Sequence, residues 1–487
     1  MTSPKPLQRF PTGVPGLDAI LDGGLFETGL YVIQGIAGAG KTILANQICF
    51  HQAREQRKAV YYTLLTEAHD RMLGFIQTLS FYDASHVPGD VNYVSGFKVL
   101  ETEGLLGVVR NIREVMARAR PSLLVVDGLV SAEDVAPSDT IFKKFLHELQ
   151  TVSVMFRCTV LLLTNVEAAR RLQAEHTMVD GILDLRATVT RLKPQRTIEV
   201  PKFRGSGHIR GTHSLEINSR GIEVRPRIEA LLRPASPPRK APAERRPFGI
   251  PSLDAVIGGG LPSCTNTMFM GPSGSGKTIL GMHFLAAGAA VGERGMFFTF
   301  YEQVDELVEK AERLGMTTFV EAVKNGTIQI VWQSSVEANL DKIGNDLLGL
   351  FHEAKPVRVF IDGMHGFQVT SDPVERIQDF FAALGDYFVS HGTTVTFTTE
   401  SGDILGRAIE PPFTNASRMC QNILLLRYTE ARGRMRRVFS VVKIRDSGFD
   451  PAIREFTITD RGIVIGDSLE DLDKVLIGQP QRVEPKD

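Results

Sequence analysis

One block of this chain occurs twice, at an almost constant offset. The segment GIAGAGKT at residues 35–42 returns as GPSGSGKT at residues 271–278, which is 236 positions later. Three further pairs keep the same order at offsets of 235 to 241 positions: FPTGVPGLDAILDGGL with PFGIPSLDAVIGGGL, LLVVD with RVFID, and PKFRGS with VKIRDS. Two copies with so long a period indicate tandem domains rather than a solenoid of short repeats.

The domain boundaries follow from this duplication and from one proline-rich stretch. Residues 233–247, RPASPPRKAPAERRP, carry five prolines and several cations, a composition typical of a semi-rigid linker. We therefore expect a first domain at 1–232, a linker at 233–247, a second domain at 248–466 and a short C-terminal tail at 467–487.

Each repeat alternates short apolar runs with helical stretches. In the first repeat, runs of buried-strand type lie at 30–34, 59–65, 123–127 and 159–164, and a helix is expected at 42–56. Strands separated by helices predict an α/β fold with a mainly parallel sheet flanked by helices.

Composition excludes several classes of protein. The chain has 487 residues and a formal net charge of −1, which gives no global attraction to nucleic acid or anionic lipid. The four cysteines are widely separated and form no CxxC pair, which argues against a zinc or dithiol site. No secretory signal and no apolar run of membrane-spanning length is present, so we expect a cytoplasmic protein without a membrane partner.

The most specific motif is GxxxxGK[ST], which follows a predicted strand and opens a predicted helix in both repeats. Its glycines let backbone N–H groups surround phosphate, and its lysine reaches the β- and γ-phosphates. Lys41 and Lys277 are therefore catalytic candidates, and Thr42 and Thr278 are candidate Mg²⁺ ligands. The expected nucleotide-binding residues are Gly38, Ala39, Gly40, Lys41, Thr42 and Ile43, and Ser273, Gly274, Ser275, Gly276, Lys277, Thr278 and Ile279.

Four acidic residues complete the expected sites. Asp127 and Asp362 end apolar strands about 85 residues after the two lysines, and a strand-end carboxylate there can hold Mg²⁺, mostly through water. The alternative for both is a turn or cap residue. Glu67 and Glu302 follow another strand and are candidates for orienting or deprotonating the attacking water, with a solvated helix-start glutamate as the alternative.

A cationic pair recurs late in each repeat. Lys202 and Arg204, and Lys443 and Arg445, have the spacing that places two charges on one face of a strand. Cations that protect an edge strand from aggregation are the alternative. Their recurrence suggests stabilisation of phosphate charge, in the manner of an arginine finger across a subunit interface.

Taken together, TGVPGLDAILDGG, KFRGSGH and KIRDSGFDPAIREFTITDRG resemble the KaiC family, a duplicated RecA/DnaB-like branch of the P-loop ATPases. The resemblance covers nearly the whole chain. It implies a homohexamer of two stacked RecA-like rings, with ATP and Mg²⁺ between subunits. Matched position by position, it assigns nucleotide contacts to Lys202, Arg204, Ser206 and His208 in the first ring, and to Arg437, Lys443, Arg445 and Ser447 in the second.

The chain departs from that family at three places. The family's paired glutamates are reduced to Thr66-Glu67 and Tyr301-Glu302. Its adjacent Ser-Thr phosphoacceptors become Ser417-Arg418, which argues against an ordered two-site cycle. Ser417 stays a candidate for autophosphorylation, with an unmodified helix-cap or surface serine as the alternative. The A-loop-like segment DKVLIGQPQRV is followed only by a short tail. We therefore expect no regulation by a KaiA-type partner, whereas a KaiB-like or other signalling partner stays open.

Three functions compete. The first is a hexameric ATPase in timing or signal transduction, with or without serine autokinase and autophosphatase activity in its second domain. The second is a RecA/DnaB-type nucleic-acid motor or recombinase. It is disfavoured because SAEDVAPSD at 131–139, where such a motor would need cations, carries three acids. The third is an ATP-assembled scaffold with negligible turnover.

Overall fold

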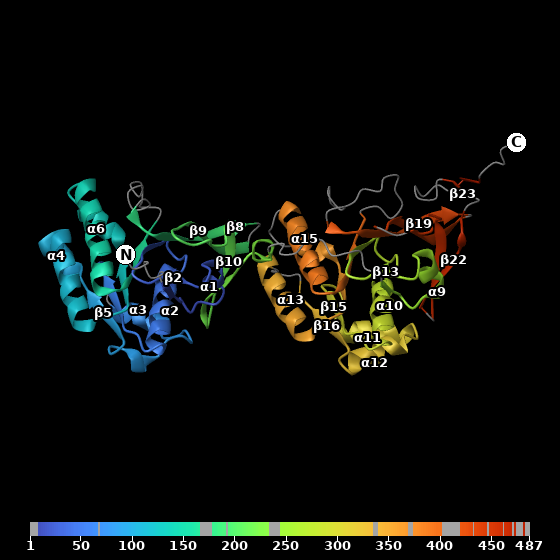
Figure 1. Ribbon diagram of the computed structural model, residues 1–487, viewed down its shortest axis with the longest axis horizontal. Helices are drawn as coiled ribbons and strands as arrows, with labels where there is room; N and C mark the ends of the chain where they lie inside the picture. The colour runs from blue at the N-terminus through green and yellow to red at the C-terminus, as the bar shows by residue number, and fades with distance from the viewer. Residues whose placement is uncertain are drawn as a thin grey trace, which may run out of the picture. The chain divides into compact units, whose positions relative to one another are not determined.

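The computed structural model describes residues 8–66, 69–165, 178–190, 193–232, 244–334, 339–368, 374–401, 419–431, 433–445, 448–460, 462–469, 472–473 and 481–482. The chain divides into two compact units, residues 1–231 and 232–487 (Figure 1). Most of the linker stretch, residues 233–243, lies outside the described residues.

The first unit is built around a nine-stranded sheet. Its strands are β1 Arg9–Phe10, β2 Leu25–Phe26, β3 Leu30–Gly35, β4 Ala59–Thr63, β5 Val91–Ser95, β6 Leu123–Asp127, β7 Thr159–Thr164, β8 Gly181–Thr190, β9 Lys193–Phe203, β10 Thr212–Asn218 and β11 Gly221–Arg225. Its helices are α1 Leu17–Ile20, α2 Lys41–Arg54, α3 His69–Ile76, α4 Phe97–Ala119, α5 Leu129–Val135, α6 Asp139–Phe156 and α8 Ile228–Leu231. The strand order is β11-β10-β9-β8-β3-β7-β6-β4-β5, and β1 pairs with β2 separately.

The second unit repeats this plan. Its strands are β12 Arg245–Arg246, β13 Leu261–Pro262, β14 Asn266–Met270, β15 Gly295–Thr299, β16 Ile328–Trp332, β17 Arg358–Asp362, β18 Thr394–Thr399, β19 Asn422–Ala431, β20 Arg434–Lys443, β21 Arg454–Thr459, β22 Gly462–Ser468, β23 Leu472–Asp473 and β24 Gln481–Arg482. Its helices are α9 Pro251–Val256, α10 Lys277–Ala289, α11 Val304–Arg313, α12 Thr317–Lys324, α13 Leu340–Ala354, α14 Met364–Gln368 and α15 Val374–Ser390. The order β16-β15-β17-β18-β14-β19-β20-β21-β22 matches that of the first sheet read from β5 to β11, and β12 with β13 and β23 with β24 form separate pairs.

In each sheet six neighbouring strands run parallel, and the other three extend the sheet in antiparallel pairing. In the first unit β5, β4, β6, β7, β3 and β8 run parallel, whereas β9, β10 and β11 form an antiparallel extension. The fold prediction of two tandem α/β domains with mainly parallel sheets is therefore confirmed.

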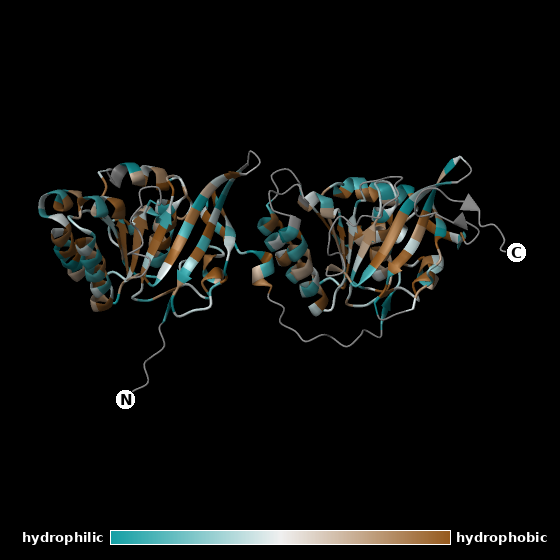
Figure 2. Cartoon of the chain, turned by 90° about the horizontal axis from the view of Figure 1, so that it is seen from above, coloured by the Kyte–Doolittle hydropathy of each residue, from teal (hydrophilic) through white to brown (hydrophobic). Residues whose placement is uncertain are grey.

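Alternate residues of the strands serve two apolar layers. In β3, Tyr31 and Ile33 belong to the core shared with α2, while Leu30 and Val32 belong to the core shared with α4 and α6. This alternation is the two-residue period of an extended strand. Brown, hydrophobic residues accordingly gather in the strands of each unit (Figure 2).

The strand predictions hold closely, with local corrections. The runs at 123–127 and 159–164 are β6 and β7, whereas the run at 59–65 ends as a strand at Thr63. The expectation that each cationic pair shares one strand is wrong, because β9 ends at Phe203 and β20 at Lys443. Arg204 and Arg445 therefore lie just beyond the strand ends. Residues 131–135 are helical, as part of α5.

Within the described part of the chain, no helix is both long and apolar enough to cross a membrane.

Candidate nucleotide-binding sites

Both glycine-rich loops connect a strand to a helix, as the motif requires. In the first unit the loop leaves β3 at Gly35 and enters α2 at Lys41; in the second it leaves β14 and enters α10 at Lys277. Gly40 and Gly276, directly before each helix, have φ angles of 107° and 101°. Side chains with a Cβ rarely adopt this left-handed region, so the loop conformation requires glycine there.

The two lysines point back into their own loops. The Lys41 Nζ donates to the carbonyls of Gly35 and Ile36 at 2.7 and 2.8 Å. The Lys277 Nζ makes the equivalent bonds to Gly271 and Pro272, both at 2.8 Å. Each lysine is the first residue of its helix, and its ammonium is held within the loop at the helix N-terminus, where the macrodipole favours an anionic ligand.

The strand-end aspartate of the second unit is buried beside the loop. The Thr278 hydroxyl donates to Asp362 Oδ2 and the Thr398 hydroxyl to Asp362 Oδ1, both at 2.7 Å. Burial raises the pKa of Asp362, while these two hydroxyls and the Lys277 ammonium oppose that rise. Burial also lowers the pKa of Lys277, against the opposing effects of Glu400 and Asp362. The second site therefore concentrates one cation and two carboxylates around the loop.

The first unit surrounds its aspartate differently. Asp127 ends β6 and is half-buried, and its Oδ2 accepts a hydrogen bond of 2.5 Å from the hydroxyl of Tyr61 on the neighbouring strand β4. Burial, followed by the charge of Asp127, raises the pKa of Tyr61 well above its ordinary value. The corresponding strand position in the second unit is Phe297, so the two sites hold their aspartates by different donors.

Of the two candidate glutamates, the structure describes only Glu302. Glu67 lies outside the described residues. Glu302 forms an ion pair with Lys310 on α11. Tyr301, at the position before it, lies with its ring against Gly363, where an added Cβ would come 2.1 Å from a ring carbon. Burial raises the pKa of Tyr301 to about 12, with further contributions from Glu400 and Asp362.

Strand register separates the cations assigned to the second site. Arg437 stands opposite Tyr428, beyond the carboxyl end of β14, and its Nε donates to the carbonyl of Gly274 at 3.4 Å. The Tyr428 hydroxyl donates to the same carbonyl at 2.7 Å. Lys443 instead stands opposite Ile423. On β20, Lys443 is six residues from Arg437, or about 20 Å along the strand. Arg437 thus contacts the loop of its own unit, whereas Lys443 and Arg445 lie toward the opposite end of the sheet.

In the first unit, residues 202–208 correspond to the segment of Lys443 and Arg445, and Ser206 in them contacts Arg9 of β1. Lys202 stands opposite Ile182, and Arg204 lies 3.8 Å from Asp180. Burial and the neighbouring Arg204 lower the pKa of Lys202, while Asp180 opposes this. The Ser206 hydroxyl accepts from the Arg9 guanidinium at 2.5 Å. His208 Nδ1 is buried with no hydrogen-bond partner among the described residues.

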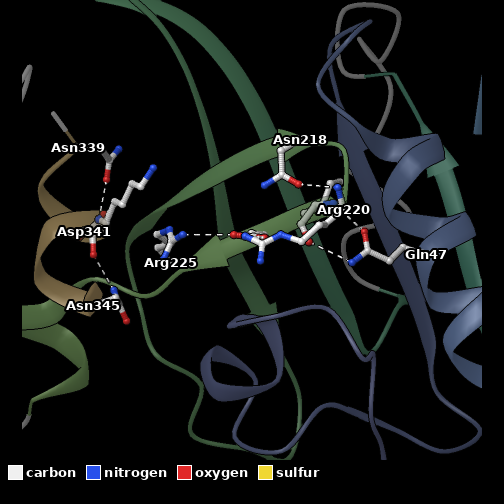
Figure 3. A network of polar contacts seen from close by, with 10 residues as sticks. Gln47, Asn218, Arg220, Arg225, Asn339, Asp341 and Asn345 are labelled. Atoms are coloured by element: carbon white, nitrogen blue, oxygen red, sulfur yellow. Dashed lines mark hydrogen bonds and ion pairs between the residues drawn. The ribbon is translucent and has the colours of Figure 1, made fainter. Parts of the chain in front are cut away.

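In the first unit, strand β11 of the antiparallel extension is hydrogen-bonded to α2, the helix that follows the glycine-rich loop. The side chain of Gln47 on α2 donates to the carbonyl of Ile222 at 3.0 Å and accepts from its N–H at 2.7 Å (Figure 3). On the same hairpin, Arg220 and Arg225 both pair with Glu223. The helix that begins at Lys41 is therefore tied to β11 by two hydrogen bonds.

Comparison with known proteins decides the family. The family model described as "ATPase: KaiC" matches residues 10–229 and again 246–470. The chain belongs to the KaiC ATPase family. It is 28% identical to circadian clock protein KaiC3 of Synechocystis sp., over 97% of this chain and 95% of the relative. It is 27% identical to the circadian clock oscillator protein KaiC of Picosynechococcus sp. (98% and 93% coverage) and 26% identical to that of Synechococcus elongatus (99% and 95% coverage).

Membership of the KaiC family does not make the two sites of this chain alike. Thr398, Tyr61, Tyr428 and Glu400 were not among the residues expected from the sequence. The two copies differ at these positions, so comparing one repeat with the other could not reveal them. Thr398 and Glu400 lie at the end of β18, whereas Tyr61 and Tyr428 lie within β4 and β19, so none of the four can be connected with the site before the strand order is known. Ser417 and Ser447 lie outside the described residues.

Proposed function

We propose that the chain binds and hydrolyses ATP with Mg²⁺ at two sites, one in each repeat. The observation that carries this proposal is the pair of matching loops, each with a lysine ammonium bonded to its own carbonyls and with an aspartate at the end of another strand of the same sheet. In each site the lysine would bind the β- and γ-phosphates. Thr42 and Thr278 would bind Mg²⁺ directly, and Asp127 and Asp362 would bind it mostly through water. Glu67 and Glu302 would orient the attacking water.

The residues present fit a bound triphosphate. The Ser275 hydroxyl oxygen, within the second loop, is buried without a hydrogen-bond partner among the described residues. The position where Gly38 would carry a Cβ has no atom within 4 Å, which leaves the first loop open to a ligand. Buried polar groups without partners are rare in proteins, and a phosphate oxygen would satisfy the Ser275 hydroxyl.

We infer further that the protein assembles as a double-ring homohexamer. Lys443 and Arg445, like Lys202 and Arg204, lie away from the loop of their own unit. A ring that brings this end of the sheet to a neighbour's loop would use these cations, with Ser206, His208 and Ser447, on the neighbour's nucleotide. Arg437 would act on its own unit's nucleotide.

The named relatives are circadian clock proteins, which supports a role in timing or signal transduction in the cytoplasm. Under this proposal the nucleotide state, and phosphorylation of Ser417 by the second site, would be read by a KaiB-like or other signalling protein. The acidic residues of α5 and the near-zero net charge disfavour a nucleic-acid motor.

The decisive experiment is incubation with Mg-ATP, followed by phosphate release, sizing and intact mass. We expect steady release, ATP-dependent hexamers and a mass increase of one phosphate that is absent from Ser417→Ala. Hexamers without release would favour an ATP-assembled scaffold. Neither release nor nucleotide binding by folded protein would refute the proposal, and tight salt-dependent binding of single-stranded DNA would favour the motor.

A further inference from the structure

We propose that Glu400 is a catalytic carboxylate of the second nucleotide site. It directly follows β18, and β18 lies between β17, which ends at Asp362, and β14, which leads into the loop. These three strands run parallel, so their carboxyl ends meet at one edge of the sheet. Glu400 therefore enters the site midway between the candidate Mg²⁺ ligand and the phosphate loop.

The backbone on both sides of Glu400 is bonded to the start of that loop. The Gly271 N–H donates to the carbonyl of Thr399 at 3.2 Å, and the Ser401 N–H donates to the carbonyl of Gly271 at 3.3 Å. The same Gly271 carbonyl accepts from Lys277 at 2.8 Å. Glu400 is thus held one residue away from each of two hydrogen bonds to the loop, and its position is set by the loop itself.

The charge of Glu400 acts on groups of the site. Thr398 of β18 directs its hydroxyl onto Asp362, and Glu400 lies directly beyond the end of the same strand. Burial lowers the pKa of Lys277 and raises that of Tyr301; the charge of Glu400 opposes the first change and adds to the second, as does that of Asp362. The Glu400 side chain is exposed, so water can reach its carboxylate.

The residue after Glu400 carries a second polar group, the hydroxyl of Ser401. The Ser401 hydroxyl oxygen is buried and, among the described residues, has no hydrogen-bond partner. A bound water or phosphate oxygen beside Glu400 would satisfy it. The site therefore offers a carboxylate and an unsatisfied hydroxyl at consecutive positions.

The other candidate carboxylate of this site, Glu302, is paired with Lys310, so its charge is already balanced, and we assign it the orienting of the water rather than the removal of its proton. The first unit has no carboxylate at the position of Glu400. There β7 is followed by Asn165, and a neutral amide cannot accept a proton from water. We infer that the two repeats obtain their base from different strands, the second from β18.

This inference rests on the proposed ATPase function, and the reaction assigned to Glu400 is the hydrolysis of ATP. The Glu400 carboxylate accepts a proton from water, and the water oxygen forms a bond to the γ-phosphorus. The bond from that phosphorus to the β,γ-bridging oxygen breaks, and its electron pair stays on ADP. Phosphate leaves, and Glu400 returns its proton to solvent. ATP and water are the only reactants.

The test isolates the second site with Lys41→Ala, which removes phosphate binding from the first. In this background we compare the parent with Glu400→Gln, Glu400→Asp and the matched control Glu321→Gln, an exposed glutamate on α12. Binding of labelled ATP and single-turnover phosphate release are measured for each. We expect Glu400→Gln to release phosphate about 100-fold more slowly, the usual scale of general-base loss, with ATP affinity within a few-fold of the parent. Glu400→Asp should fall between, and Glu321→Gln should match the parent.

The outcomes separate this inference from the proposed function. If the parent hydrolyses ATP and Glu400→Gln does so equally fast, Glu400 is not catalytic although the site is an ATPase. If Glu400→Gln loses ATP binding in proportion to its rate, the residue is needed for binding only and the inference also fails. If the parent binds ATP without hydrolysing it, the proposed hydrolysis at the second site itself is refuted.

Discussion

Acidification should destabilise the second unit through one histidine. His283 lies on α10, the helix that begins at Lys277, and burial lowers its pKa from 6.5 to about 4. Its Nε2 is buried with no hydrogen-bond partner within the described residues, next to Gly462. The folded unit therefore holds this imidazole neutral at a pH where the unfolded chain protonates it.

The sign and size follow from linkage. Because the pKa is lower in the folded state, the stability is complete above pH 6.5 and is lost as the pH falls from 6.5 toward 4. The full difference in pKa corresponds to about 3 kcal/mol, and about 2 kcal/mol of it is lost between pH 7 and pH 5. A replacement that cannot titrate, such as His283→Gln, removes this contribution at every pH.

The assay uses the single tryptophan of the chain. Trp332 ends β16 in the second unit, so its fluorescence reports the unfolding of that unit in urea. Between pH 7 and pH 5 the free energy of unfolding of the natural protein should fall by about 2 kcal/mol more than that of His283→Gln. Other titrating groups cancel in this comparison. Equal pH dependence in the two proteins, or a greater loss in the variant, would refute the reasoning.

Three further outcomes follow from the second unit. Lys277→Ala should reduce bound ATP from two to one per chain in calorimetric titration; two remaining sites would contradict the assignment. Arg358 is fully buried and donates to Glu293 and to the carbonyls of Pro247 and Phe284. Glu293 keeps its ion pair with Arg246, so Arg358→Met should cost about 1–3 kcal/mol in urea unfolding because it leaves the two carbonyls without this donor; an unchanged midpoint would disprove this. Thr398→Val should raise the Mg²⁺ concentration needed for hydrolysis about tenfold, because it removes a donor to Asp362. Thr398→Ser should restore it, and an unaltered Mg²⁺ requirement in the valine variant would count against the role of Asp362.

The loops and strand-end aspartates could be predicted because their evidence is local. GxxxxGK[ST] places a strand, a turn and a helix within a few residues of one another, and the turn depends on glycines at fixed positions. Asp127 and Asp362 follow continuous apolar runs, which can be recognised without knowing the neighbouring strands. The same local spacing failed for Arg204 and Arg445, since nothing in a Lys-x-Arg pattern shows where a strand stops.

The partners of those residues could not be predicted, because they depend on the order of strands in the sheet. Thr398 reaches Asp362 only because β18 lies beside β17. Tyr61 reaches Asp127 only because β4 pairs with β6. Glu400 gains its place from the position of β18 between β17 and β14.

The sequence alone was sufficient to establish the duplication, the two α/β domains, the phosphate loops and the resemblance to the KaiC family. Each of these depends on residue types at short or repeated spacings along one chain. The tertiary structure alone decided how the two sites differ and which end of the sheet each cation occupies. Those differences arise between residues 66 to 154 positions apart, where contact is set by strand order and register rather than by spacing.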